Sequence, residues 1–217
     1  MGSFTAGNAS TRRNAMISVI VPVREEGPEV AARLSVFHRP PESELLLADG
    51  GGSRGSRLAR AAAEARGGIF FFLHADSRPP DDALGIIRRA IGKGADAGAF
   101  SLAYGDSAPA MRWIAWWANR RSRVARLPYG DQGIFCTRAA YLRSGGFRDL
   151  PLCDDLDLVL RLRRAGRFEI RPEKTITSSR RYRESGALRQ VLRNWKVMAG
   201  YFAGVRPETL SRWYEGR

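Results

Sequence analysis

Three apolar segments recur along the first third of the chain, and each is followed by a polar loop and a helix-like stretch. The segments 16–22, 43–48 and 69–73 are rich in Val, Ile, Leu and Phe. Apolar runs without alternation are typical of strands that are covered on both faces. Buried strands that alternate with helices predict a parallel sheet with right-handed crossovers, flanked by helices. We therefore expect the polar loops after these strands to lie on one edge of the sheet.

The rest of the chain continues this α/β alternation. Helices are expected at 28–38, 54–66, 81–93, 109–125, 153–166 and 186–203, and further strands at 95–104 and at the start of 131–147. The helix 109–125 carries Trp113, Trp116 and Trp117, which we expect to pack in the core because of their large apolar rings. No repeat or linker interrupts the pattern. We predict one domain at 16–217, with a C-terminal amphipathic helix, after a polar, disordered tail at 1–15.

The chain is strongly basic. Its 36 Lys and Arg against 22 Asp and Glu give a formal net charge of +14. This excess favours an anionic partner such as a nucleoside diphosphate, a phospholipid surface or a nucleic acid, although a general bias toward Arg explains scattered arginines equally well. A nucleic-acid binder should show a basic face with aromatic stacking or a known module. Neither is visible in the sequence, so no nucleic-acid partner is expected.

Cysteine usage and hydropathy indicate a cytoplasmic setting. The two cysteines, Cys136 and Cys153, form no disulfide framework and no CxxC pair, and we expect both to be small core residues. The N-terminal residues lack the apolar stretch of a signal peptide. No segment has the 18 or so consecutive apolar residues of a membrane span.

Carboxylates stand at the positions where an α/β sheet places its ligands. Asp49 follows the strand 43–48, and Asp76 follows the strand 69–73. Ligands of open α/β sheets bind at the carboxyl ends of the strands, whereas strand-end Asp residues are also common in ordinary turns. Asp154 and Asp155 begin a helix, where acidic side chains are favoured by the positive end of the helix dipole in any case. From the residues alone, both a functional and a purely structural role stay open.

The order of these motifs resembles a known enzyme family. The segments "VIVPVREE", "LLLADGGGS", "FLHADS", "YGDQGIF", "GGF" and "CDDLDLVLRL" follow one another as in the inverting family-two glycosyltransferases with the GT-A fold. The wording "LHADSRPP", "PYGDQGIF" and "TSSRRY" is most similar to the bacterial branch named radical-SAM/selenodomain-associated or arsenosugar-biosynthesis glycosyltransferases. The resemblance implies a nucleoside-diphosphate sugar donor, foremost a UDP-sugar, a hydroxyl acceptor of unknown identity, and a divalent cation.

The resemblance also implies roles for individual residues. The nucleotide would be bound by Pro22, Val23, Arg24, Glu25, Asp49 and Gly50. A carboxylate such as Asp49 forms short, directional hydrogen bonds with base N–H groups or ribose hydroxyls. Asp155 would be the catalytic base, because an acceptor hydroxyl is a weak nucleophile until a positioned carboxylate takes its proton. Asp131, Gln132 and Asp154 would contact the acceptor or the donor sugar.

The metal site departs from the family pattern in one residue. Asp76 matches the last acid of the DxD motif, which holds Mn²⁺ or Mg²⁺ against the diphosphate. His74 stands where the family has the first Asp, and imidazole suits Mn²⁺ better than Mg²⁺. The stretch from Asp49 to Asp76 is also shorter than usual for the family, where it holds an additional strand and a loop whose Arg or Asn approaches the donor. Arg57 or Arg60 are candidates to replace the missing contact.

Two other classes of function compete with a glycosyltransferase. The first is a nucleotidyltransferase-like enzyme, although "PVREEGPEV" lacks the glycine-rich loop that such enzymes carry after the first strand. The second is a basic module with impaired donor binding, attached to membrane or nucleic acid. The helix 186–203, with Leu188, Leu192 and Trp195 on one face, suits packing in the core, a homodimer contact, or peripheral contact with the inner membrane face.

Overall fold

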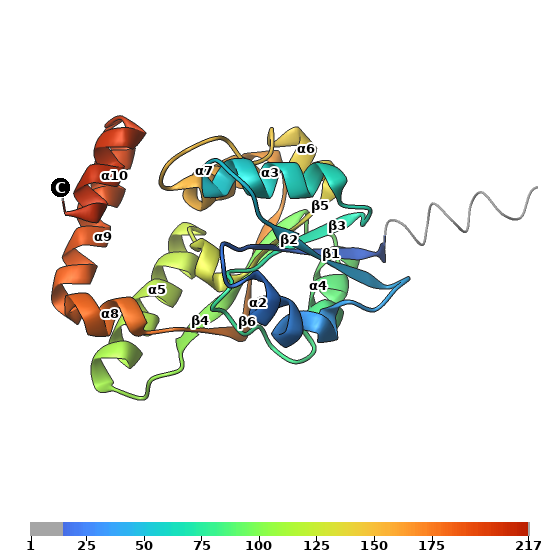
Figure 1. Cartoon of the computed structure of the whole chain (residues 1–217), viewed down its shortest axis with the longest axis horizontal. Coiled ribbons are helices and arrows are strands. Elements are labelled where there is room, and N and C mark those ends of the chain that lie inside the picture. The colour runs from blue at the N-terminus through green and yellow to red at the C-terminus, as the bar shows by residue number, and fades with distance from the viewer. Residues whose placement is uncertain (1–14, 217) are drawn as a thin grey trace, which may run out of the picture.

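Six strands pair into one mixed sheet in the order β2-β1-β3-β5-β4-β6 (Figure 1). Their bounds are β1 (Ile17–Pro22), β2 (Ser43–Ala48), β3 (Ile69–Phe72), β4 (Ala97–Tyr104), β5 (Ile134–Thr137) and β6 (Phe168–Thr177). The computed structural model describes residues 15–216, so the expected tail lies outside the described residues apart from Ala15. Among the strands of the described residues, β5 alone runs antiparallel to its neighbours, and the sheet is mostly parallel, as expected.

Helices cover both faces of the sheet, and the C-terminal helices lie beyond one end of it (Figure 1). They are α2 (Gly27–Leu34), α3 (Arg54–Glu64), α4 (Ala83–Gly92), α5 (Pro109–Ala125), α6 (Arg138–Arg143), α7 (Asp154–Ala165), α8 (Arg180–Ser185), α9 (Ala187–Phe202) and α10 (Pro207–Glu215), with the short 3₁₀ turns η1 (Ser35–Phe37) and η2 (Gly130–Gln132). One core cluster packs α3, α6 and α7 on the sheet, and a second packs α2 and α4 on the opposite face. Among the described helices, none has both the length and the apolar character needed to cross a membrane.

The carboxyl ends of β1, β2 and β3 lie at the same edge of the sheet. Pro22 of β1 pairs with Ala48 of β2, and Ile20 of β1 pairs with Phe72 of β3, all in parallel register. In Figure 1, β1 starts beside the grey N-terminal trace and runs toward the side where α8, α9 and α10 lie. The loops that carry the sequence motifs therefore face this C-terminal group of helices.

The expectation that the tryptophans of α5 pack in the core is wrong. Trp113, Trp116 and Trp117 are 53%, 54% and 43% exposed, whereas Met111 and Ile114 are buried. The helix has an apolar stripe on each side, and only the stripe with Met111 and Ile114 is buried. Spacing along one helix cannot distinguish an inward stripe from an outward one.

The C-terminal region also differs from expectation. Strand β6 and helices α8 and α10 were not foreseen, because β6 alternates charged and apolar residues at the sheet edge and the two helices are short. In α9, Leu188, Leu192 and Trp195 are exposed, so of the three roles left open for this face, packing in the core does not hold for these residues. Cys136 is buried as expected, whereas Cys153 is only partly buried.

Candidate active site

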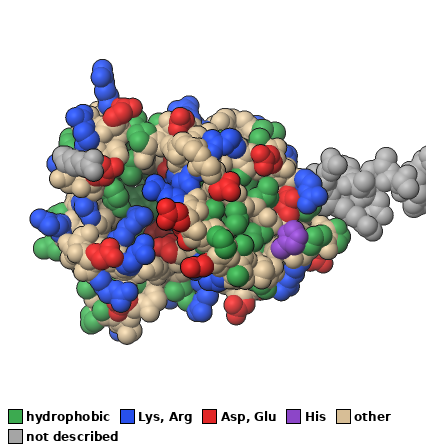
Figure 2. Space-filling view, in the orientation of Figure 1, with side chains coloured by type: hydrophobic (Ala, Val, Ile, Leu, Met, Phe, Trp, Pro, Cys, Tyr) green, Lys and Arg blue, Asp and Glu red, His purple; other side chains and the backbone are tan. Residues whose placement is uncertain are grey.

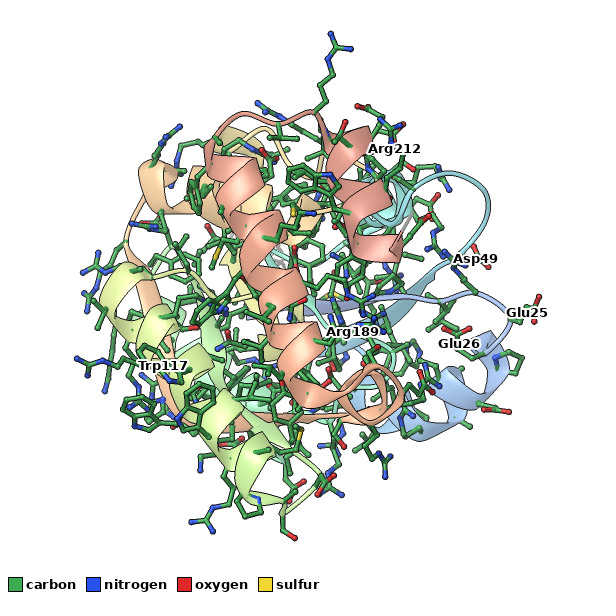
Figure 3. All side chains as sticks on the ribbon, turned by 90° about the vertical axis from the view of Figure 1, so that its left-hand side faces the viewer. Glu25, Glu26, Asp49, Trp117, Arg189 and Arg212 are labelled. Carbon is green, nitrogen blue, oxygen red and sulfur yellow. The ribbon has the colours of Figure 1, made fainter. Side chains whose placement is uncertain are left out.

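The loops after β1 and β2 lie side by side at the carboxyl edge. The Val23 N–H donates to the carbonyl oxygen of Ala48 over 3.2 Å, which keeps the two chains together one residue beyond the strand pair. Past this bond, Arg24, Glu25 and Asp49 are exposed, and Figure 3 shows Glu25 and Asp49 on the same side of the molecule. The two segments that were predicted to bind the nucleotide are thus neighbours.

Arginines of α3 hold these two loops through their backbone. Arg57 is buried and donates from Nη1 to the carbonyl oxygen of Val23. Arg60 donates from Nη2 to the carbonyl oxygen of Asp49 over 3.3 Å. Gly50 follows with φ +83°, a conformation that favours glycine because it has no Cβ. Backbone contacts fix the loop, and the Asp49 side chain stays exposed to solvent.

A charged network lies on the other side of the edge, between α3, α7 and the loop after β3. Arg54, at the start of α3, donates hydrogen bonds to Asp154 from two nitrogens. Its Nη2 lies 2.5 Å from Oδ1, and its Nε lies 3.0 Å from Oδ2. Its Nη2 also lies 3.5 Å from Oδ2 of Asp155, and its Nη1 lies 2.9 Å from Nε2 of His74. One guanidinium therefore joins residues that are 20 and 100 positions away in the sequence.

Asp155 is the more accessible carboxylate of the pair. Its side chain is 16% exposed, against 3% for Asp154. Oδ2 accepts a hydrogen bond from the Gly130 N–H at 2.7 Å, and Oδ1 accepts one from the Leu156 N–H at 2.8 Å. Burial acts to raise the pKa of Asp155, but Arg54 and these two N–H groups outweigh it and hold the pKa below its usual range. Asp155 is therefore ionised at neutral pH and fixed in orientation.

The acidic side chains at the start of α7 point in two directions. Cys153, just before the helix, has φ 61°, a strained conformation for a residue with a Cβ. Asp154 and Asp155 follow and face Arg54. Asp157 faces the other way, where its Oδ2 accepts from Nε of Arg161 at 3.0 Å. The helical rotation of two residues separates Asp157 from the network.

His74 acts as a neutral acceptor in this network. Burial lowers its pKa to about 3, and the charge of Arg54 also favours the uncharged ring. A neutral imidazole has one unprotonated nitrogen, so Nε2 can accept the hydrogen bond from Nη1 of Arg54. Gly130 packs against the same ring, where a Cβ would lie 2.5 Å from Nε2 of His74. This close approach explains why the loop carries a glycine next to Asp131.

Asp131 and Asp76 complete an acidic group at the edge. Burial, with the charges of Asp155 and Asp76, raises the pKa of Asp131 to about 6 against the opposing charge of Arg121. Within the described part of the chain, the buried Oδ1 of Asp131 has no hydrogen-bond partner. Asp76 is exposed in the turn after β3. The structure brings Asp76, Asp131 and Asp155 close enough for their charges to interact.

Gln132 does not lie where the sequence predicted. Its side chain is fully buried, Oε1 accepts from the hydroxyl of Ser122 at 2.8 Å, and Nε2 donates to the carbonyl oxygen of Phe100 at 2.9 Å. The backbone N–H of Tyr129 also donates to Oε1 at 3.2 Å. These bonds occupy both ends of the amide, so the side chain is placed to fix the 129–132 loop and not to contact a sugar.

Arg54 is the residue that sequence reasoning missed. Arg57 and Arg60 were considered for the contact that the shortened 49–76 stretch lacks, yet both bind backbone carbonyls near β1 and β2. Arg54 alone of the three reaches the carboxylates. Arg54 directly follows Ser53, which caps α3 by accepting a hydrogen bond from the Ser56 N–H. This position at the start of a helix is the sequence signal that could have indicated Arg54.

The residues present fit a divalent cation that has further ligands from a bound anion. Between residues 15 and 216, no group of three or more His, Cys, Asp or Glu side chains is arranged to hold a metal ion alone. The unpartnered Oδ1 of Asp131 and the exposed carboxylate of Asp76 are hard oxygen donors, which Mg²⁺ and Mn²⁺ prefer. His74 already accepts a hydrogen bond from Arg54, so it is not free to act as a ligand through Nε2.

Comparison with known proteins identifies the fold. No family model matches the chain, and no curated protein sequence matches it. Crystal structures of TarS from S. aureus do resemble it, with a TM-score of 0.58 at 14% identity over 75% of this chain and 36% of TarS. The TarS fragment 1–349 gives a TM-score of 0.58 at 14% identity, over 76% of this chain and 60% of the fragment. The same fragment with UDP-GlcNAc gives 0.55 at 13% identity, over 75% and 58%.

The chain spans between about a third and three fifths of the length of these structures. At such low identity the likeness concerns the fold alone. The expected GT-A type α/β fold, a single domain with a mostly parallel sheet flanked by helices, is confirmed.

Proposed function

We propose that the chain is an inverting family-two glycosyltransferase that moves a sugar from a nucleoside-diphosphate sugar to an acceptor hydroxyl. The observation that carries the proposal is the state of Asp155, an ionised and partly exposed carboxylate fixed by Arg54 and by the Gly130 N–H at the carboxyl edge of the sheet. Within this class, the motif wording favours the radical-SAM/selenodomain-associated branch. The GT-A fold supports the class as a whole.

The donor would lie along the edge from β2 to β3. Asp49 follows β2, and the acidic group follows β3, two strand positions away in the sheet order. Neighbouring strands are about 4.8 Å apart, so the two ends of the site are separated by about 10 Å, a span suited to a nucleoside diphosphate. Pro22–Glu25, Asp49 and Gly50 would hold the nucleoside. TarS has been crystallised with UDP and with UDP-GlcNAc, which makes a UDP-sugar the first donor to test.

Asp155 would act as the catalytic base. The acceptor oxygen attacks the anomeric carbon while the bond from that carbon to the diphosphate oxygen breaks, and the electron pair leaves with the diphosphate. The hydroxyl proton passes to Asp155, and a positioned base of this kind contributes about 10²–10⁴-fold to the rate. A single displacement inverts the configuration at the anomeric carbon.

Arg54 and Asp154 would position this base. Asp154 is almost fully buried and accepts hydrogen bonds from Nε and Nη2 of Arg54, while Nη2 also reaches Asp155. The positive charge keeps Asp155 ionised when the site is filled, and the two backbone N–H bonds leave little freedom to the carboxylate. Asp76 and Asp131 would hold Mn²⁺ or Mg²⁺, which when bound neutralises charge that develops on the diphosphate.

Thermal unfolding with a panel of nucleotides tests the proposal. The panel contains UDP-GlcNAc, UDP, and GDP- and dTDP-sugars, each with and without Mn²⁺ or Mg²⁺. A ligand at a hundred times its Kd stabilises by about 2.7 kcal/mol, which for a domain of this size raises Tm by roughly 5–10 °C. We expect this shift for one base, enlarged by the cation. No shift with any nucleotide would contradict the proposal and favour a basic binding module.

A further inference from the structure

Helix α5 presents a row of large apolar side chains to solvent. Trp113, Trp116, Trp117 and Val124 are 53%, 54%, 43% and 76% exposed. Trp116 and Trp117 lie three and four residues after Trp113, and Val124 lies seven residues, about two turns, after Trp117, so the four form one stripe along the outer side of the helix. The opposite stripe, with Met111 and Ile114, is buried against the protein. The hydrophobic core is therefore packed without these tryptophans.

The tryptophans form a continuous aromatic surface. The rings of Trp116 and Trp117 meet edge to face with centroids 5.1 Å apart, and those of Trp113 and Trp117 do so at 6.0 Å. Arg120 lies over the ring of Trp116 at 5.9 Å. Contiguous exposed apolar patches mark interaction sites, whereas apolar side chains scattered singly on a surface need no such explanation.

Helix α9 carries a second row of exposed apolar side chains. It packs beside α5, and Figure 3 looks onto this side of the molecule, with α9 across the middle and Trp117 on α5 next to it. The exposed apolar residues of α9 are Leu188, Leu192, Trp195 and Phe202, at 72%, 54%, 54% and 55%. We call these four residues, together with Trp113, Trp116, Trp117 and Val124, the α5–α9 face.

A basic groove borders the aromatic surface. A cavity of about 540 Å³ lies beside α5 and is lined by Trp116 and by Arg112, Arg120, Arg123 and Lys174, with Asp106 as its acidic side chain. Among the residues that the structure describes, none of these four cations is ion-paired with a carboxylate. In contrast, Arg54 and Arg161 near the candidate site are paired with Asp154 and Asp157.

We propose that the α5–α9 face docks onto a bilayer surface that contains anionic phospholipids. Tryptophan prefers the membrane interface because its ring is apolar and its N–H is polar, and the aliphatic members of the face add apolar area for the acyl boundary. The cations of the groove then meet lipid phosphates, and each basic side chain near an anionic surface contributes to binding. The net charge of +14 attracts the whole chain to such a surface.

The composition of the face favours lipid over its alternatives. Single-stranded nucleic acid also binds to aromatic and basic side chains, but it uses aromatic rings as stacking platforms. Leu188, Leu192 and Val124 offer no stacking surface, although they are among the most exposed apolar residues. A second copy of the chain would bring two basic grooves together, each lined by four cations and the single carboxylate of Asp106.

Vesicle co-sedimentation of the full chain tests the proposal. We expect binding to vesicles of phosphatidylcholine with about one third phosphatidylglycerol, and little binding to pure phosphatidylcholine. The triple variant Trp113→Ser, Trp116→Ser, Trp117→Ser should bind at least about tenfold more weakly. The variant Arg112→Gln, Arg120→Gln, Arg123→Gln should lose on the order of a hundredfold, since each charge contributes a factor of about five.

Matched controls separate this face from general charge and apolarity. Arg33→Gln, Arg39→Gln, Lys93→Gln removes the same charge from exposed residues elsewhere, and Val36→Ser, Leu142→Ser removes exposed apolar side chains elsewhere. Both controls should bind anionic vesicles within about twofold of the unmodified chain. Quenching of the unmodified chain's tryptophan fluorescence by brominated lipids provides a second measurement that requires no variant.

Several results would overturn the proposal. Absence of binding to anionic vesicles is one, and equal loss in the control variants is another. A concentration-dependent dimer in analytical ultracentrifugation that the tryptophan variant abolishes would assign the face to a second copy of the chain. Displacement of the protein from vesicles by an oligonucleotide but not by inorganic phosphate, with no quenching by brominated lipid, would assign it to nucleic acid. None of these assays requires that the chain be a glycosyltransferase.

Discussion

The two sides of the carboxyl edge of the sheet are built differently. On the β1–β2 side, Asp49 and Glu25 are exposed, and the protein holds their loops only through backbone carbonyls. On the β3–α7 side, Asp154 and Asp155 are tied to Arg54 through their side chains. Figure 2 shows acidic and basic side chains gathered around a hollow between these regions and the C-terminal helices.

If the chain is the proposed glycosyltransferase, this difference separates a binding side from a catalytic side. A carboxylate that is exposed and unattached can adapt to a ligand, but it loses conformational freedom when it binds. A carboxylate fixed by two backbone N–H groups and a guanidinium is already oriented, so it can act on a reacting atom without rearrangement. We therefore expect changes on the β1–β2 side to affect ligand affinity and changes on the β3–α7 side to affect turnover or folding.

The largest effect is expected for Asp155→Asn. An amide cannot take the acceptor proton, so turnover should fall by about 10²–10⁴-fold, measured as nucleotide release from the donor. Nucleotide affinity should change by less than about twofold, because Asp155 lies at the end of the site away from Asp49. A parallel loss of affinity would break the separation of the two sides.

The next effect is expected for Arg54→Ala. Removal of the guanidinium leaves Asp154, whose side chain is 3% exposed, without its partner, and the free energy of unfolding should fall by about 2–3 kcal/mol. The expected loss is set below that for a fully buried ion pair, because the Arg54 side chain is 32% exposed and solvent screens its charge. Urea denaturation measures it, with Arg60→Ala as the control from the same helix. Equal losses in the two variants would show that the network contributes no special stability.

A smaller effect is expected for Asp49→Asn. Loss of charge-assisted hydrogen bonds to the nucleoside should weaken nucleotide binding by roughly tenfold to a hundredfold. Turnover at saturating donor and the unfolding free energy should stay close to those of the unmodified chain, because Asp49 is exposed. Isothermal titration with UDP and a denaturation curve check both points. Unchanged affinity would place the nucleoside elsewhere on the edge.

The smallest effect concerns pH and His74. Its pKa is lowered to about 3 in the folded state, so the unfolded chain, with an ordinary pKa near 6.5, binds the proton first as pH falls. The stability that the neutral ring contributes is therefore present above pH 6.5 and is lost below it, with a decrease of about 1 kcal/mol between pH 8 and pH 6. His74→Gln should remove this slope, and His38→Gln, at the exposed histidine, should not. Equal slopes in both variants would contradict the pairing with Arg54.

The positions of the strands and of the edge were predictable from local patterns. The runs 16–22, 43–48 and 69–73 became β1, β2 and β3 with boundaries within one residue, because short apolar runs that end at Pro or Gly fit strands covered on both faces. The loops with Asp49 and Asp76 followed from the parallel order of these strands. The charged, alternating strand β6 carried no such pattern and was missed.

What the sequence alone determined was thus the α/β alternation, the parallel strands, and the edge at which Asp49 and Asp76 stand. These depend on hydrophobic runs and helix spacing, which act over a few residues. Only the tertiary structure decided that Arg54 contacts the carboxylates while Arg57 and Arg60 do not. It also decided that the Gln132 side chain is buried with its amide hydrogen-bonded inside the protein, and that the tryptophans of α5 face outward. Each of these depends on which surfaces meet across many tens of residues, and a local pattern does not record the partner that a side chain will find.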